Sequence, residues 1–189
     1  MVRCMPPLKE ERPRTAEDYW NLPDGVRAEL IDGRLYDMTS PSRIHQGIVM
    51  GIAHAMFGYV ETHGGAGHVY LAPLAVNLFG DESTFVEPDV LVVCDESKLS
   101  DRGCEGAPDL VVEVVLPSSR RTDYFTKAGL YERAGVREYW IVDPAARQTN
   151  VYTYGSESRL LATYLFDDPV PVGIWGGLSI TLGKILARV

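Results

Sequence analysis

Hydrophobic positions recur along this chain with two different spacings, one typical of helices and one typical of strands. Between 42 and 62 the apolar residues return every three or four positions, which predicts a long amphipathic helix that ends near Gly64. Shorter helices are indicated by a starting signal at Thr15 and by Gly135, a residue type common at helix ends. Three helices are predicted, over 16–21, 42–62 and 122–134, the last begun by Thr122 or Asp123.

Runs of β-branched and aromatic residues between turn residues predict the strands. Asp32 and Gly33 separate two such runs and are typical of a tight turn, which predicts an N-terminal hairpin over 28–31 and 34–38. The further strands are predicted over 68–78, 85–93, 110–116, 139–142, 150–154, 159–166 and 179–182. A helix between the third and fourth of these strands indicates a crossover connection within one sheet.

These elements predict one domain of the α/β (mixed α+β) class. A length of 189 residues suits a single domain. Residues 1–14 are rich in proline and charged side chains and are predicted as a flexible N-terminal arm, so that 15–189 form the domain.

The composition is that of an ordinary globular protein, with 46% hydrophobic and 23% charged residues, and it argues against collagen, coiled coil and general disorder. The 18 basic and 26 acidic residues give a formal net charge of −8, whereas nucleic-acid-binding domains are usually basic. A DNA-binding surface would therefore need local basic patches or metal ions. The segment 118–137 offers such a patch, and its Arg120 and Arg121 are candidates for contacts with DNA phosphates.

Cysteine usage and the N-terminus bear on the cellular compartment. The three cysteines form no CxxC pair, and so sparse a set is typical of a reducing compartment. The N-terminus has no apolar run of signal-peptide length, and no stretch approaches the roughly 18 apolar residues of a membrane span. A cytoplasmic protein is expected.

Two carboxylates interrupt the most apolar strands. Glu113 lies within Leu-Val-Val-Glu-Val-Val-Leu, a run typical of a strand buried on both faces, where an unpaired carboxylate is costly. Asp89 follows Pro88 in a second such run, at a position where a bulge would redirect its side chain. If the two strands pair, the carboxylates converge and form a site for a divalent cation such as magnesium. The alternatives are that Glu113 faces water at a strand edge and that Asp89 only forms a turn.

One face of the helix that follows the Glu113 strand carries a second group of candidates. Asp123, Lys127 and Tyr131 are spaced four residues apart and therefore lie on the same face. A Lys127 ammonium near the two carboxylates would orient an attacking water and stabilise charge that develops on a phosphate. Alternatively, Lys127 is solvated and pairs only with Asp123, while Tyr131 belongs to the core.

Three further polar residues are weaker candidates. Glu29 in the first strand is an additional metal ligand, an orienting carboxylate or simply an exposed strand residue. His45 lies in the first turn of the long helix, where a surface or hydrogen-bonded histidine is the alternative to a supporting role at the site. Glu87 shares the strand face of Asp89 and is expected to be exposed or to lie behind the ligands.

A second Pro-Asp step, Pro108-Asp109, resembles the one at Asp89. Asp109 shares a strand face with Glu113, but four residues of strand separate their Cα atoms by about 13 Å. Asp109 is therefore not expected to share a metal ion with Glu113.

Several segments carry a family resemblance when they are taken in order: EPDVLVV, PDLVVEVVLPSS, a D-x3-K-x3-Y pattern and GVREYWIVDP. Together they resemble the Uma-type family of putative restriction endonucleases, which is placed in the PD-(D/E)xK nuclease superfamily. The segments AELIDGRLYDM and SPSRIHQGIV are similar to the opening hairpin and helix of that family, so the resemblance covers about 27–144. It implies a restriction-endonuclease-like core, in which helices flank a central mixed sheet, with an N-terminal hairpin and a long helix.

The resemblance also implies roles for individual residues. Asp89 corresponds to the aspartate of the PD half-motif, and Glu113 to the acidic residue of the second half-motif. The superfamily usually has a lysine two residues later, where this chain has Val115, and the resemblance moves the role of that lysine to Lys127 in the following helix. Three more residues match recurrent family positions: Glu29, His45 and Tyr131.

The leading hypothesis is a divalent-metal-dependent endonuclease that hydrolyses DNA phosphodiester bonds. Asp89, Glu113 and Glu29 would bind Mg or Mn, which activates water and polarises the scissile phosphate, while Lys127 would position that water. The acidic net charge predicts that DNA binding is weak or depends on a partner. Restriction-type nucleases often pair to cut both strands, so a homo-oligomer is expected, as a dimer, without membrane association. Aromatic residues considered for the interface, and equally for the core, are Trp140, Tyr152, Tyr154 and Trp175.

Two other functions are compatible with the same residues. The chain could be a catalytically silent binding or regulatory module on the same fold, which the intact Asp89, Glu113 and Lys127 argue against. It could also be a metal-dependent hydrolase of a small phosphorylated molecule or nucleotide, which a net charge of −8 suits no worse than DNA.

Overall fold

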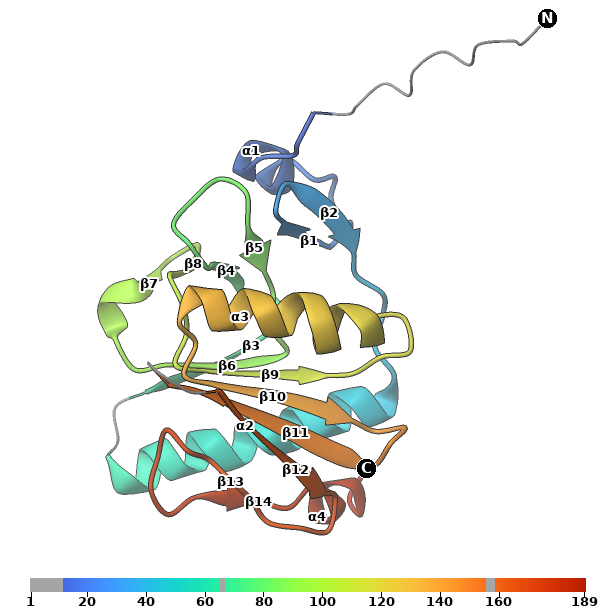
Figure 1. Cartoon of the computed structure of the whole chain (residues 1–189), viewed down its shortest axis with the longest axis vertical. Helices are drawn as coiled ribbons and strands as arrows, with labels where there is room; N and C mark the ends of the chain where they lie inside the picture. Colours follow the sequence, from blue (N-terminus) through green and yellow to red (C-terminus); the bar gives the residue numbers. More distant parts are fainter. Residues whose placement is uncertain (1–11, 65–66, 156–158) are drawn as a thin grey trace, which may run out of the picture.

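The computed structural model describes residues 12–64, 67–155 and 159–189, which fold around two six-stranded β-sheets (Figure 1). The hairpin sheet runs, in spatial order, through β2 (Arg34–Asp37), β1 (Ala28–Ile31), β5 (Phe85–Val86), β4 (Ala75–Asn77), β8 (Gly103–Glu105) and β7 (Leu99–Ser100). The central sheet runs through β12 (Arg159–Leu165), β11 (Gln148–Tyr154), β10 (Glu138–Asp143), β9 (Leu110–Val114), β6 (Val90–Val93) and β3 (His68–Leu71). A small third sheet pairs β13 (Val170–Pro171) with β14 (Ser179–Ile180).

The helical segments are α1 (Ala16–Trp20), α2 (Arg43–His63), the 3₁₀ turn η1 (Glu96–Lys98), the π-helix η2 (Thr122–Lys127), α3 (Ala128–Ala134) and α4 (Leu182–Leu186). In the central sheet β9 and β10 are parallel and joined through η2 and α3, whereas the other neighbouring strands are antiparallel. The sheet is therefore mixed, and the predicted crossover connection is confirmed.

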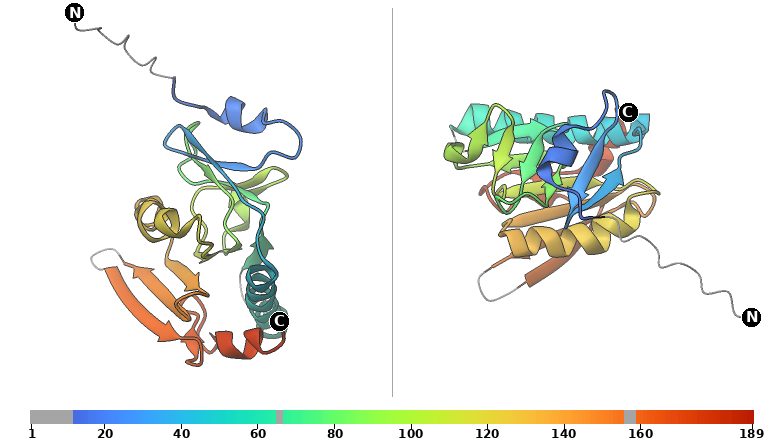
Figure 2. Two further views of the ribbon diagram at one scale, coloured as in Figure 1. Left: turned by 90° about the vertical axis from the view of Figure 1, so that its right-hand side faces the viewer. Right: turned by 90° about the horizontal axis from the view of Figure 1, so that it is seen from above.

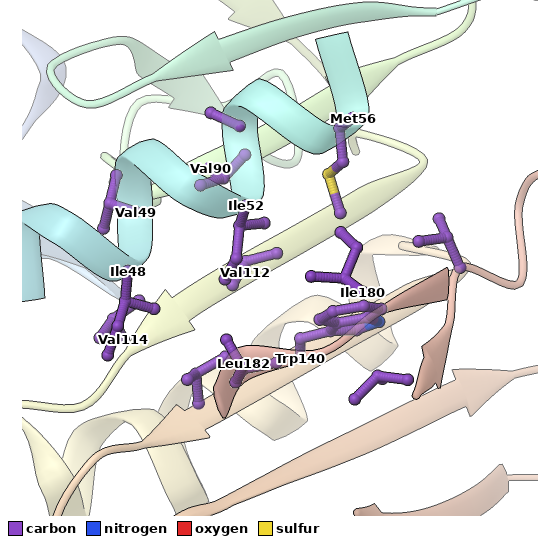
Figure 3. Packing of buried hydrophobic residues seen from close by; sticks show 14 of the residues in the cluster. Ile48, Val49, Ile52, Met56, Val90, Val112, Val114, Trp140, Ile180 and Leu182 are labelled. Atoms are coloured by element: carbon purple, nitrogen blue, oxygen red, sulfur yellow. The ribbon is translucent and has the colours of Figure 1, made fainter. Parts of the chain in front are cut away.

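The central sheet is covered on both faces because successive strand residues point to opposite sides. On one face, Ile48, Ile52 and Met56 of α2 are fully buried and pack against Val112 and Trp140 (Figure 3). Their four-residue spacing explains why α2 forms as one amphipathic helix. On the other face, α3 packs against the alternate residues of the same strands: Leu130 and Tyr131 with Val111 and Ile141.

Two strands that the sequence predicts as continuous are each divided between the two sheets. The predicted strand 68–78 is broken near Pro73, which leaves β3 in the central sheet and β4 in the hairpin sheet. The predicted strand 85–93 is broken at Pro88 into β5 and β6 in the same way. Both continuous predictions are wrong because proline has no N–H to donate and interrupts a ladder. As a consequence, the chain around Pro88 joins the two sheets.

The third predicted helix begins earlier than expected and in a different conformation. Its first helical residue is Arg120, and neither Thr122 nor Asp123 acts as the cap. Residues Thr122–Lys127 form a π-helix, a rare conformation that is frequent at functional sites. The carboxylate of Asp123 accepts a hydrogen bond of 2.6 Å from the Ser119 hydroxyl, so it faces inward and does not cap the helix. The π-helix ends at Lys127, the predicted lysine of the site.

The N-terminal boundary is only partly visible. Of the predicted arm, residues 1–11 lie outside the described part of the chain. The backbone N–H of Arg14 donates to the carbonyl of Gly33 at 2.8 Å, so the end of the arm contacts the hairpin turn. Among the described residues, none of the helices has the length and apolar character needed to cross a membrane.

Candidate functional site

A pocket of about 230 Å³ lies where the hairpin sheet meets the central sheet. Figure 2 shows the hairpin sheet stacked over one end of the molecule, with α2 and α3 on opposite sides below it. Residues from both sheets and from two helical segments, α2 and η2, line the pocket. Six of the predicted site residues are among them: Glu29, His45, Asp89, Glu113, Asp123 and Lys127.

The pairing of β6 with β9 brings Asp89 beside Glu113. The two strands are antiparallel, with Val90 opposite Val112, so the residue before β6 lies next to the last residues of β9. The Asp89 Oδ2 atom accepts a hydrogen bond of 2.8 Å from the backbone N–H of Val114. The predicted pairing of these strands is therefore confirmed, and both carboxylates line one pocket.

Lys127 joins carboxylates that come from different sheets. Its Nζ atom donates to Glu113 Oε1 at 2.8 Å and to Glu29 Oε1 at 2.9 Å. The Asp123 carboxylate, one helical turn earlier, lies 3.9 Å from the same nitrogen. Each side chain in these pairs is at most 6% exposed, so the interactions form away from bulk water. Lys127 is thus a buried ammonium and not the solvated lysine of the alternative interpretation.

Further contacts fix the orientation of each carboxylate. The Tyr131 hydroxyl donates to Glu113 Oε1 at 2.8 Å, and the Glu87 backbone N–H donates to Glu29 Oε1 at 2.9 Å. His45 Nε2 lies 3.2 Å from Asp89 Oδ2, the atom that also accepts from Val114. In each case the contacts fall on one oxygen, and within the described chain the second oxygen accepts no hydrogen bond. One oxygen of each carboxylate is therefore open to a ligand in the pocket.

The pocket has an excess of negative charge. Its lining includes six carboxylates and two permanent cations. Burial raises the pKa of the Glu113 carboxyl well above its usual value, with Lys127 opposing the shift and the neighbouring carboxylates adding to it. Burial likewise raises the pKa of Asp123 to about 6. A bound cation would relieve both shifts, because it stabilises the charged carboxylates.

The same charges keep Lys127 protonated. Burial alone lowers the pKa of its ammonium, but attraction by Glu113, Glu29 and Asp123 outweighs burial and raises that pKa well above the usual value. Tyr131 is affected in the same direction, because burial and the charge of Glu113 raise the pKa of its phenol. Lys127 is therefore a fixed cation and Tyr131 a fixed hydroxyl donor at neutral pH.

The open carboxylate oxygens of Asp89 and Glu113 are of the kind that a hard divalent cation prefers. Magnesium is commonly held by one or two carboxylates together with waters and substrate phosphates. Within the described part of the chain, no cluster of three or more His, Cys, Asp and Glu side chains is arranged to hold a metal ion. The donor set thus suits a hard cation on two carboxylates, whereas Glu29 is engaged by Lys127 and by the backbone of Glu87.

The two arginines predicted to contact DNA differ in their surroundings. Arg120 forms an ion pair with the buried carboxylate of Asp143, and its guanidinium lies 5.0 Å from the ring centre of Tyr124. Arg121 is exposed and has no ion pair with any described residue. Of the two, Arg121 is therefore the one with a guanidinium free for a phosphate.

Sequence reasoning underestimated Glu87. It was expected to be exposed or behind the ligands, and it is 9% exposed. Its carboxylate accepts hydrogen bonds from Tyr19 at 3.0 Å and from Arg27 at 2.5 Å, while its N–H holds Glu29. The expectation of an exposed side chain is therefore wrong, and a place behind metal ligands stays a prediction. No local signal identifies the partners, because Tyr19 lies 68 residues away in the chain.

Comparisons with known proteins agree with this architecture. The family model described as Uma2, putative restriction endonuclease, matches residues 16–182. The crystal structure of a putative nuclease belonging to DUF820 from Anabaena variabilis ATCC 29413 has a TM-score of 0.73 at 20% identity, over 93% of this chain and 98% of that chain. This likeness shows a shared fold, and the two mixed sheets confirm the predicted mixed α+β class.

A weaker likeness is to the type IIG restriction endonuclease BpuSI, with a TM-score of 0.41 and 16% identity, over 80% of this chain and 16% of that chain. A score of this size does not establish a common fold. Among curated proteins, no sequence matches this chain.

Proposed function

This chain belongs to the Uma2 family of putative restriction endonucleases, and we propose that it hydrolyses DNA phosphodiester bonds with a divalent metal ion. The observation that carries the proposal is the position of Lys127. Its ammonium lies between Glu113 and Glu29, in the pocket that also contains Asp89. A buried lysine among carboxylates with open oxygens suits phosphoryl chemistry, in which a cation must offset charge on the reacting phosphate.

Asp89 and Glu113 are the proposed ligands of Mg or Mn. When bound, such an ion acts as a Lewis acid on the phosphate and makes water a better nucleophile. His45 and Tyr131 are proposed positioning residues, because each holds one oxygen of a ligand carboxylate and so directs the other oxygen into the pocket. Glu29 was predicted as a ligand or as an orienting carboxylate, and its bond to Lys127 favours the orienting role.

Lys127 supplies a positive charge at the reacting phosphate. Because its pKa is raised by its carboxylate neighbours, it holds its proton and does not serve as the base. Two of its three N–H groups are donated to Glu113 and Glu29, which keep it in place, and the third can be donated to the attacking water or to a phosphate oxygen. Asp123 is held by the hydroxyl of Ser119.

DNA binding is expected to depend on the metal. Six carboxylates line the pocket against Arg27 and Lys127, so a phosphate group is repelled until a cation is bound. Outside the pocket, Arg121 and the half-exposed Arg120 are the proposed phosphate contacts. Weak or partner-dependent DNA binding, a dimeric state and a cytoplasmic location stay predictions.

A hydrolase of small phosphorylated molecules is a second candidate, and the dimensions of the pocket favour it. The pocket of about 230 Å³ is small, and its acidic lining does not favour a long polyanion. The same residues would perform the chemistry, so only the substrate distinguishes the two candidates.

The test is a cleavage assay with three substrate classes: supercoiled plasmid, short single-stranded DNA and free nucleotides. Each is incubated with Mg, with Mn and with a chelator, using the wild type and Glu113→Gln. The nuclease proposal predicts metal-dependent nicking of plasmid that falls on the order of 100-fold in Glu113→Gln.

A matched control is Glu132→Gln, which removes an exposed, ion-paired carboxylate that does not line the pocket. This variant is expected to retain wild-type cleavage. Hydrolysis of nucleotides alone would favour the second candidate. Plasmid cleavage that survives both the chelator and Glu113→Gln would contradict the proposed site.

A further inference from the structure

The outer strand of the central sheet is exposed along its whole length. β12 pairs only with β11, and all but one of its seven residues are exposed. Leu160, Leu161 and Leu165 are 63%, 55% and 62% exposed, which is unusual for large apolar side chains on one strand. These leucines lie on both faces of the strand. Leu161 is opposite Tyr152 of β11, whose side chain belongs to the core cluster on the α3 side of the sheet. The next residue, Ala162, is opposite Val151, which belongs to the cluster on the α2 side.

The free edge of β12 also presents backbone hydrogen-bonding groups. At its end, the Phe166 N–H donates to Arg147 on the β11 side, whereas the Leu165 N–H donates to the side chain of Asp168. Because N–H directions alternate along a strand, the N–H groups of Thr163 and Leu161 point away from β11, as that of Leu165 does. No other strand of the described chain pairs with this edge.

Most of β12 lacks the usual protections of an edge strand. Natural edges are blunted by charged residues, by proline or by a bulge. The segment from Leu160 to Leu165 has no charged residue and no proline, and its register with β11 is one-to-one throughout. By contrast β2, at one edge of the hairpin sheet, is short and carries Arg34 and Asp37.

We propose that a second copy of this chain pairs antiparallel along β12, with the two-fold axis at Ala162, so that the two central sheets become one. An antiparallel edge is self-complementary, as the symmetric interface of a homodimer requires. The charges that flank the strand agree, because Arg159 begins it while Asp167 and Asp168 follow its end. The antiparallel arrangement sets Arg159 of each copy near the acidic end of the other. The proposal does not depend on the nuclease function.

The proposed register explains which side chains are exposed. Around Ala162, Leu160 of one copy lies opposite Tyr164 of the other, and Leu161 lies opposite Thr163. The exposed leucines therefore gain apolar neighbours on both faces of the joined sheet. Trp140 and Tyr152, considered for the interface from the sequence, are buried in the core and do not contribute exposed surface. A single pair of seven-residue strands is a small interface, so the dissociation constant is expected on the order of 10 μM.

Sedimentation analysis over a range of concentrations around that value tests the interface. The wild type is expected to pass from monomer to dimer, and Leu161→Lys to stay monomeric, because it places two charges at the centre of the joined sheets. Leu161 is exposed in the monomer, so the variant should keep the wild-type melting temperature. The matched control is Met50→Lys, an equally exposed apolar residue on α2, which is expected to dimerise like the wild type.

Cysteine cross-linking tests the register. In a Cys4→Ser background, Ala162→Cys places two cysteines across the two-fold axis at a Cα distance of about 4.5–5.5 Å, which a disulfide can span. Leu160→Cys places its two cysteines about 13 Å apart, beyond that reach. Oxidation is expected to link the first variant and not the second.

Three results would overturn the proposal. One is a wild type that is monomeric throughout, and another is a dimer that Leu161→Lys leaves intact. The third is a dimer that Met50→Lys disrupts instead, which would assign the interface to the exposed face of α2.

Discussion

The antiparallel pair of β6 and β9 has a Pro-Asp step at each end, and the two ends differ in what surrounds the aspartate. Asp89 precedes β6 and accepts a hydrogen bond of 2.8 Å from the backbone N–H of Val114. Asp109 precedes β9 and accepts one of 2.7 Å from the backbone N–H of Cys94. Each aspartate therefore ties the start of its own strand to the end of the other.

Beyond this shared role, the two ends diverge. The second oxygen of Asp109 accepts a hydrogen bond of 3.2 Å from Arg137, a side chain that is 58% exposed. The second oxygen of Asp89 faces the pocket, next to the buried Glu113 and Lys127. A Pro-Asp step thus serves as a structural link at both ends, and the candidate chemistry arises only where other buried charges converge.

The largest expected effect is on the rate of DNA cleavage when the aspartate at each end of the β6–β9 pair is neutralised in turn. Asp89→Asn keeps an acceptor for Val114 but loses the negative charge proposed to hold the metal, so metal-dependent cleavage should fall on the order of 10³-fold. Asp109→Asn should change the rate by less than about threefold. Plasmid-nicking rates measured for both variants test this prediction. Equal losses of rate would contradict a catalytic role confined to the Asp89 end.

The second effect concerns the cation at each end. Lys127→Met leaves Glu29, Glu113 and Asp123 buried without their counter-charge, which should lower the free energy of unfolding by about 3–5 kcal/mol. Arg137→Met breaks an exposed ion pair and should cost less than about 1 kcal/mol. Urea unfolding of the two variants at neutral pH gives both values. A similar cost at the two ends would mean that the buried cluster is less strongly coupled than its distances indicate.

The third effect is stabilisation by metal. Without a metal ion, the carboxylates at the Asp89 end repel one another. Magnesium at about 100 times its dissociation constant should therefore add about 2.7 kcal/mol of stability and raise the melting temperature by about 5–10 °C. Asp109→Asn should keep this response, and Glu113→Gln should lose it. Thermal denaturation with and without chelator measures it, and an unchanged response in Glu113→Gln would exclude that carboxylate as a ligand.

The fourth effect is a dependence of stability on pH. Burial raises the pKa of Asp123 from 3.8 to about 6 in the folded protein. The folded state holds this proton more tightly than the unfolded state. Protonated Asp123 therefore stabilises the fold below pH 4, and this contribution is lost as the pH rises through about 6. Asp123→Asn should remove about 1–3 kcal/mol of that loss in the metal-free protein. Unfolding free energies measured from pH 4 to pH 8 would contradict the assignment if the slope is the same in both proteins.

The smallest expected effect compares Arg121, which lies outside the two ends, with Arg137 at the Asp109 end. Arg121→Ala removes an exposed guanidinium that has no described ion-pair partner, so DNA affinity should fall a few-fold and the salt dependence should weaken by about one ion. Arg137→Ala, at the Asp109 end, should leave both quantities unchanged because that guanidinium is paired with Asp109. Fluorescence anisotropy with labelled DNA at several salt concentrations distinguishes them.

A large part of the fold and the site could be predicted because the relevant signals are local. The spacing of Ile48, Ile52 and Met56 identifies α2, and the apolar run around Glu113 identifies β9 as a central strand. The four-residue spacing of Asp123 and Lys127 places both on the inner face of one helix. The convergence of Asp89 with Glu113 was predicted from the pairing of two apolar runs, and the family resemblance added matching family positions for Asp89 and Glu29. The functional roles of all these residues stay predictions.

Other features depend on contacts between distant parts of the chain. The predicted strand 85–93 is divided at Pro88 because its two halves pair in different sheets. The hydrogen bond between Lys127 and Glu29 joins residues 98 positions apart, and it forms only because the hairpin sheet is docked against the central sheet. Neither a hydrophobic period nor a turn motif carries information about such docking.

The sequence by itself thus determined the periodic elements, the mixed class of the fold and the presence of carboxylates too costly to bury without partners. The tertiary structure decided which partners they have. The two Pro-Asp steps are alike in sequence, yet antiparallel pairing puts them at opposite ends of β6 and β9. Of the two aspartates, only Asp89 lines the pocket to which β1 contributes Glu29 and η2 contributes Lys127. The reason is physical: local spacing sets which way a side chain points, whereas its electrostatic environment is set by whatever long-range packing brings within a few ångströms.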